Sequence, residues 1–152
     1  LARPAAAAAQ AAREADALTQ ALRHEHVGVF AYDAVLAADV LRADEQRRAE
    51  RIRGHEAQHA EALAKALGEL GWPLPPAPGR AEHVEVPEVR AAVDALRDRR
   101  DALALLARVE QLASDVHRAA IARLRDGRHI QLAATILAAE ASHLVVWSPP
   151  IR

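Results

Sequence analysis

Glu56-Ala57-Gln58-His59 and Glu140-Ala141-Ser142-His143 are two copies of one short pattern, Glu-x-x-His, separated by most of the chain. Residues three apart on an α-helix lie on the same face, about one turn from each other. Each copy therefore offers a carboxylate and an imidazole to the same point. Both groups are common metal ligands, so the pair of motifs indicates a metal site built on helices.

Proline placement predicts where those helices run. No proline occurs between Pro4 and Pro73 or between Pro87 and Pro149, and both intervals are rich in alanine, a strong helix former. The segment 71–87 joins them and holds five prolines, so we predict no helix there. We expect an all-α fold with helices near 6–41, 45–70, 88–125 and 128–147. A separate first piece around 88–99 is the alternative for the third helix.

Each interval is expected to fold back on itself as a hairpin. Asp126-Gly127 interrupts the second, because glycine ends a helix at low cost. In the first, Arg42-Ala43-Asp44 is the predicted break, with Asp44 as the N-cap of the next helix.

A single glutamate interrupts the apolar stripe of each predicted helix. Glu110 and Glu140 have their midpoint at residue 125, and Glu25 and Glu56 have theirs near residue 40, so each hairpin brings its two glutamates level. A carboxylate facing a core is costly unless it is paired or bound to metal. We therefore predict one two-metal site with six ligands: Glu25, Glu56, His59, Glu110, Glu140 and His143.

Composition narrows the chemistry. The chain has 152 residues, which suits one domain over 1–152, and its net charge of -1 gives no reason to expect nucleic acid as a partner. With no cysteine, thiolate zinc sites, iron–sulfur clusters and disulfides are excluded. No apolar run approaches the roughly 18 to 20 residues that span a bilayer, so we predict no membrane span.

The order of these motifs resembles the ferritin-like di-iron carboxylate superfamily, which includes ferritins, bacterioferritins and rubrerythrins. In that plan two helices give one glutamate each and two give Glu-x-x-His. The resemblance implies an antiparallel four-helix bundle with a crossover between the second and third helices. The connector is long enough for a crossover, but its length leaves a plain up-down-up-down path open.

The same resemblance implies two iron ions as cofactors, with manganese as the alternative. Glu56 and either Glu110 or Glu140 would bridge the ions, with His59 on one and His143 on the other. Tyr32 matches a tyrosine that bacterioferritins and rubrerythrins place beside the metals.

His117 occupies the equivalent position by pseudo-symmetry, seven residues after Glu110 as Tyr32 is seven after Glu25. Both side chains are expected to hydrogen-bond the ligating carboxylates. His24 and His26, which flank Glu25, are predicted to be surface residues.

The expected function is oxidation of ferrous iron with oxygen or peroxide, and a homodimer is a candidate assembly. The sequence lacks the cysteine module of rubrerythrins and the methionine that binds haem in bacterioferritins. What remains of the pattern resembles small stand-alone ferritin-like domains of bacteria, many of them exported. Export, with a targeting segment upstream of Leu1, and a cytoplasmic location are therefore alternatives.

Two other interpretations remain open. His55-Glu56-Ala57-Gln58-His59 also spells His-Glu-x-x-His, the zinc-protease signature, with Glu82, His83 or Glu85 as the nearest candidates for a third ligand. That interpretation leaves Glu25, Glu110 and the second Glu-x-x-His without a role. The other is a non-catalytic bundle that binds metal for structure alone or not at all.

Overall fold

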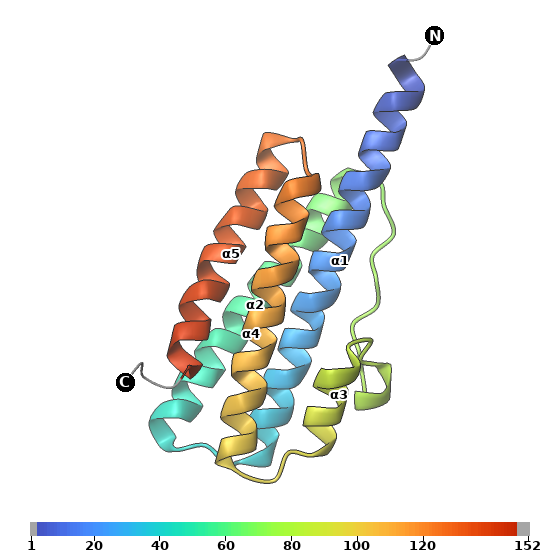
Figure 1. Ribbon diagram of the computed structural model, residues 1–152. Helices are drawn as coiled ribbons and strands as arrows, with labels where there is room; N and C mark the ends of the chain where they lie inside the picture. Colours follow the sequence, from blue (N-terminus) through green and yellow to red (C-terminus); the bar gives the residue numbers. More distant parts are fainter. Residues whose placement is uncertain (1–2, 149–152) are drawn as a thin grey trace.

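A computed structural model describes residues 3–148, and all regular structure in that range is helical. The elements are α1 (Arg3–Ala38), α2 (Ala43–Glu69), the short 3₁₀-helix η1 (Ala81–His83), α3 (Pro87–Asp94), α4 (Arg99–Arg123) and α5 (Gly127–Trp147). The four long helices form a bundle, and α3 lies beside one end of it (Figure 1). The predicted all-α four-helix bundle is confirmed.

The two hairpins are joined by a crossover. Helices α1 and α2 form one antiparallel pair and α4 and α5 form the other, and α1 also packs on α4. The connector after α2 runs back along the length of the bundle, so α2 and α4 point in the same direction (Figure 1). The chain therefore follows the crossover path and not the plain up-down-up-down path.

The first turn differs from the prediction. Helix α1 already ends at Ala38, and Asp39 adopts a left-handed φ of 51°. Asp44 is not the N-cap of α2, because Arg42 occupies that position. The carboxylate of Glu45 instead accepts the backbone N–H of Arg42 at 3.0 Å. Glutamate at the third helical position is the residue that accepts the N–H of the N-cap residue in a capping box, so the start of α2 is marked by Glu45 and not by Asp44.

The predicted third helix consists of two helices, as its alternative reading proposed. Helix α3 ends at Asp94, and Asp98 caps α4 by accepting the backbone N–H of Asp101 at 2.9 Å. One further correction concerns the connector, which contains the 3₁₀ turn Ala81–His83 although no helix was predicted there. A single 3₁₀ turn needs only three residues, so it fits between the prolines.

Apolar layers lie on both sides of the level that carries the predicted ligands. One layer joins α1, α2, α4 and α5 through Leu18, Leu22, Leu63, Ala120 and Ile136. The other includes Val35, Leu105, Leu106 and Trp147, together with residues of α3. The ligand level is therefore closed off along the bundle axis in both directions.

Glu14 fastens the α4–α5 turn to α1. Its carboxylate accepts the backbone N–H groups of Arg125 and Asp126 at 2.9 and 3.2 Å. It also lies 2.9 Å from Nδ1 of His129, and both side chains are buried. Burial raises the pKa of Glu14, but the hydrogen bonds from His129 and the turn outweigh it and lower the pKa. This charged contact holds the second hairpin against the first.

Helix α5 is long and apolar enough, by length and composition alone, to cross a membrane. The expectation that no stretch would pass this test is therefore wrong for α5. The mean hydropathy of its 18-residue window is 1.4, because neutral serine, threonine and glutamine interrupt the apolar residues without lowering the average much. Core helices of bundles pass the same test, and α5 buries Glu140 and His143 against the other helices.

Candidate metal centre

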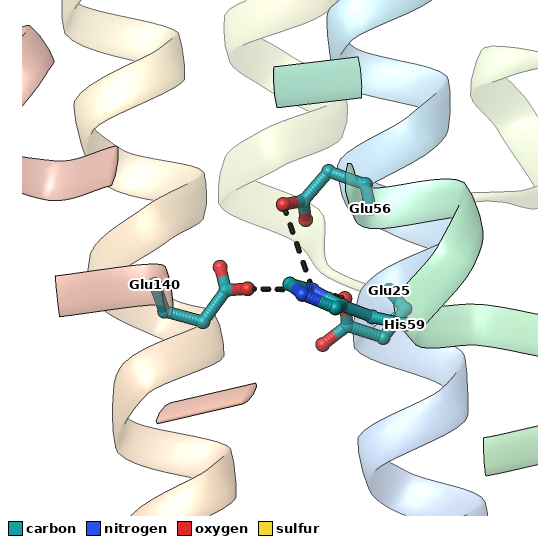
Figure 2. A group of neighbouring side chains, drawn as sticks. All are labelled: Glu25, Glu56, His59 and Glu140. Atoms are coloured by element: carbon teal, nitrogen blue, oxygen red, sulfur yellow. Dashed lines mark hydrogen bonds and ion pairs between the residues drawn. The ribbon is translucent and has the colours of Figure 1, made fainter. Parts of the chain in front are cut away.

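The six predicted ligands meet in the middle of the bundle. Glu25 comes from α1, Glu56 and His59 from α2, Glu110 from α4, and Glu140 and His143 from α5. All four glutamates are fully buried, and the two histidines keep only a small exposed edge. Figure 2 shows Glu140 reaching across from α5 toward His59 and Glu56 on α2. The two hairpins thus supply three ligands each.

The ligand atoms form two overlapping groups, each compact enough to hold one ion. One group contains Glu25, Glu56, His59 and Glu140, and the other contains Glu56, Glu110, Glu140 and His143. Within each group the ligand atoms all lie within 4.8 Å of one another. Glu56 and Glu140 belong to both groups. They are therefore the carboxylates placed to be shared by two ions, with one glutamate and one histidine left for each ion alone.

The imidazole Nδ1 atoms face the carboxylates. Nδ1 of His59 lies 2.9 Å from Glu140 and 3.2 Å from Glu25. Nδ1 of His143 lies 3.3 Å from both Glu56 and Glu110. The two rings are stacked, with their planes inclined by 20°. In each ring, Nδ1 is the atom directed toward the ligand group.

Burial and neighbouring charge raise the pKa of the two shared carboxyl groups. Burial is the main cause in both, and it raises the pKa of Glu56 to about 8 and that of Glu140 to about 9. Burial also raises the pKa of Glu25, but hydrogen bonds with His117 and His59 outweigh it, so the pKa of Glu25 is lowered. The shared carboxyls therefore hold protons at neutral pH when no cation is present.

The two ligand histidines show the opposite balance. Burial lowers the pKa of His59, but contacts with Glu140 and Glu25 outweigh it and raise the pKa to about 10. Burial also lowers the pKa of His143, and contacts with Glu110 and Glu56 raise it to about 9. In the absence of a bound cation, protonated His59 and His143 therefore balance negative charge on the neighbouring carboxylates.

The pattern of unsatisfied atoms fits bound metal. Within residues 3–148, the buried atoms that make no hydrogen bond of good geometry include both carboxylate oxygens of Glu56 and Glu140, Oε2 of Glu110 and Nδ1 of His143. Three of these oxygens have only an ion-pair contact with a histidine Nδ1, at 2.9 to 3.3 Å. Buried polar atoms are normally paired, because leaving one unpaired costs about 1 to 3 kcal/mol. Here they converge on one volume. Oxygen and imidazole ligands without thiolate suit iron or manganese, and four carboxylates offset the charge of two divalent ions.

Tyr32 and His117 hold the two unshared carboxylates from the opposite hairpin. The Tyr32 hydroxyl on α1 donates to Oε1 of Glu110 on α4. His117 on α4 reaches back to Oε1 of Glu25 on α1, with Nε2 at 2.6 Å. Both side chains are fully buried, and Trp147 in turn donates its indole N–H to the Tyr32 oxygen at 2.7 Å. These bonds fix which carboxylate oxygen remains available to a metal.

Burial raises the pKa of Tyr32 well above its usual value, and the adjacent charge of Glu110 adds to the effect. The phenol therefore remains a hydrogen-bond donor throughout the physiological pH range. A donor fixed in this way holds Oε1 of Glu110 and leaves Oε2 to face the other ligand atoms.

Gly28 makes room for Glu56, a feature that the sequence analysis did not identify. A Cβ atom at position 28 would lie 2.6 Å from Oε2 of Glu56, closer than real Cβ atoms come to any neighbour. Glycine in the middle of a helix costs about 1 kcal/mol relative to alanine. Its position, one turn after Glu25, was the only signal in the sequence that could have identified it.

His55 does not join the ligand group. Its Nδ1 lies 3.1 Å from Nε2 of His143, on the side of that ring away from the carboxylates, and the two rings are stacked. A zinc protease needs both histidines of His-Glu-x-x-His on the same ion. In this structure His59 faces the carboxylates, while His55 lies behind the other ligand histidine. This arrangement favours a supporting contact over the protease interpretation.

His24 and His26 are both partly buried, which differs from the prediction of surface residues. His24 lines a cavity of about 230 Å³ between α1 and the connector. His26 has a buried Nδ1 without a partner among residues 3–148. The connector covers this face of α1, and the helix periodicity alone could not predict where the connector would lie.

Comparison with known proteins agrees with the fold. The sequence profile of the ferritin-like domain family matches residues 13–149, so the chain belongs to that family. A search of curated proteins finds no match. One similar solved structure is that of a conserved hypothetical protein from Mycobacterium tuberculosis. The two chains are 18% identical, and the similarity covers 94% of this chain and 96% of that one with a TM-score of 0.78.

Proposed function

We propose that this ferritin-like protein binds two iron ions and oxidises ferrous iron with oxygen or peroxide. The observation that supports it most directly is the pair of overlapping ligand groups that share Glu56 and Glu140. The unpaired, buried oxygens of those two residues add a reason for cations to bind there. The ferritin-like domain and its Glu/His cluster are features of the chain, whereas the identity of the ions is part of the proposal.

Under this proposal the ligands divide into three roles. Glu56 and Glu140 would lie between the two ions, while Glu25 with His59 and Glu110 with His143 would each complete one coordination sphere. When bound, two ferrous ions supply one electron each, and oxygen takes both electrons and two protons to become hydrogen peroxide. The four carboxylates would stabilise trivalent ions more than divalent ones, because the attraction grows with the charge of the ion.

The residues around the ligands would hold this arrangement during the change of charge. Tyr32 and His117 each fix one carboxylate by a buried hydrogen bond, which limits ligand movement as the ions become smaller and more highly charged. The apolar layers above and below the site exclude water from these contacts.

The first test is metal stoichiometry by elemental analysis of wild type, Glu56→Ala and Glu140→Ala. We expect about two iron or manganese ions per chain, with both ions lost or much weakened in each variant, because the two groups share these residues. Glu50→Ala is the matched control, since Glu50 is an exposed glutamate on α2. One zinc ion that depends on His55 and not on Glu140 would refute the two-metal site.

The second test concerns catalysis. Ferrous iron is added anaerobically to the metal-free protein, and oxygen or peroxide follows while ferric absorbance is recorded. We expect ferric iron to form faster than in buffer, and Glu140→Ala to remove the difference. If two ions bind but ferrous iron is oxidised no faster than in buffer, the oxidase proposal is wrong and the protein is a metal-binding bundle without this activity.

A further inference from the structure

A groove of about 600 Å³ opens beside the end of the bundle where α2 and α4 begin and α5 ends. Its apolar wall comes from α4 and α5, and Arg100 stands at its edge. Leu103 and Ala107 are partly buried there, while Ala104 and Val146 are exposed. The groove lies outside the metal centre and is in the size range of ordinary small-molecule sites.

The charge around this groove is positive. Three arginines line it, Arg48, Arg99 and Arg100, against one acidic residue, Glu45. Arg99 makes a two-pronged ion pair with Glu45, which lowers the pKa of Glu45 to about 2, so this pair is neutral in sum. Arg48 lies 3.3 Å from Asp44. The groove is thus left with an excess of one positive charge.

Arg100 carries that excess. Among residues 3–148 it has no carboxylate within ion-pair distance, unlike the other two arginines of the groove. Its guanidinium can donate two parallel hydrogen bonds to a carboxylate, the arrangement in which arginine binds anions most strongly. It is also in the first turn of α4, where the helix dipole favours a negative charge.

We propose that this groove binds a small monoanion with an apolar body, such as a fatty carboxylic acid. The carboxylate would pair with Arg100, and the hydrocarbon would cover Leu103, Ala107 and Val146. This inference does not depend on iron or on oxidation. One unpaired cation beside an uncharged wall matches one negative charge on an apolar molecule, and a neutral molecule or a polyanion would match it less well.

Trp147 gives a direct signal for binding. It lines the groove, and its indole N–H is fixed to the Tyr32 oxygen. The chain has only two tryptophans, so Trp72→Phe leaves Trp147 as the sole one. In that background the metal-free protein is titrated with dodecanoate, below its micelle concentration, while tryptophan emission is followed. Dodecanol has the same tail without the charge and serves as the paired probe.

We expect saturable binding of one dodecanoate per chain and much weaker binding of dodecanol. Arg100→Gln should raise the dissociation constant for dodecanoate about tenfold, through loss of a charge-assisted contact. Ala104→Phe should abolish binding by filling the groove. Arg90→Gln, which removes an exposed arginine of α3 away from the groove, should leave the constant unchanged.

Three results would overturn the proposal. Equal binding of dodecanol and dodecanoate would remove the role of charge, and an unchanged constant in Arg100→Gln would remove the role of that arginine. A concentration-dependent doubling of mass, lost in Ala104→Phe, would show that a second copy of the chain covers the groove. Because every titration uses metal-free protein, failure here would not count against the proposed iron site.

Discussion

Replacing Gly28 by alanine is expected to weaken metal binding while the bundle stays folded. The added Cβ would lie 2.6 Å from Oε2 of Glu56, about 0.8 Å short of ordinary van der Waals contact. Metal–oxygen distances tolerate only about 0.2 Å of error. The carboxylate end of Glu56 can rotate away, so the clash is relieved by displacing a ligand that both ions share.

The size of the effect follows from these distances. The side chain moves without disturbing the backbone, and alanine gains about 1 kcal/mol of helix propensity, so the metal-free variant should unfold within a few degrees of wild type. Metal affinity should fall at least about tenfold, the lower end of what misdirected ligands cost. Both ions are expected to weaken, because Glu56 belongs to both groups.

Gly54→Ala is the matched control, since it lies on α2 two residues before Glu56 and has open space around its Cβ position. It should raise stability by about 1 kcal/mol and leave metal affinity unchanged. The measurements are thermal unfolding of both metal-free variants and titration with ferrous iron under anaerobic conditions. If Gly28→Ala bound iron as tightly as Gly54→Ala, the positioning argument would be refuted.

Three further outcomes are expected. Metal binding at pH 7 should release protons and should strengthen as pH rises toward 9, because four ligand groups have pKa values of about 8 to 10 and carry protons when no cation is bound. Calorimetry in buffers of different ionisation enthalpy would detect the released protons, and a metal affinity that does not change with pH would contradict the prediction. Tyr32→Phe should keep two ions per chain but lower affinity about 10- to 100-fold, since Glu110 loses its donor; competition with a chelator measures this, and wild-type affinity would argue against a positioning role. Glu14→Ala should destabilise the protein by about 2 to 4 kcal/mol, because two backbone N–H groups and His129 lose their acceptor. The melting temperature measures this loss, and a change below about 1 kcal/mol would show that water replaces the carboxylate.

The meeting of the six Glu and His side chains could be predicted from the sequence because helical geometry is regular over long distances. Each hairpin brings its two glutamates to one level, because they lie at equal distances from the turn. The pairs are Glu25 with Glu56 and Glu110 with Glu140. The family assignment is confirmed by the match over residues 13–149.

The details that escaped prediction depend on tertiary contacts. No glycine or proline marks the end of α1 at Ala38, because Asp39 itself adopts the left-handed conformation there. The partial burial of His24 depends on where the connector passes over α1. Gly28 became meaningful only when the side chain of Glu56, on another helix, was placed against it. The spacing of residues along a single helix does not indicate any of these contacts, because each is made with another segment of the chain.

Each ligand group draws on both hairpins, and this gives bound metal a mechanical role. An ion held by Glu25, Glu56, His59 and Glu140 would tie α5 to α1 and α2, as a crosslink would. The connector 71–87 would then be a redundant tether, since the loaded centre joins the same two halves directly. In a chain cut by protease in that connector, the loaded centre would hold the halves together in addition to the apolar layers and the Glu14 contact. Chelation would remove the first of these links and leave the other two.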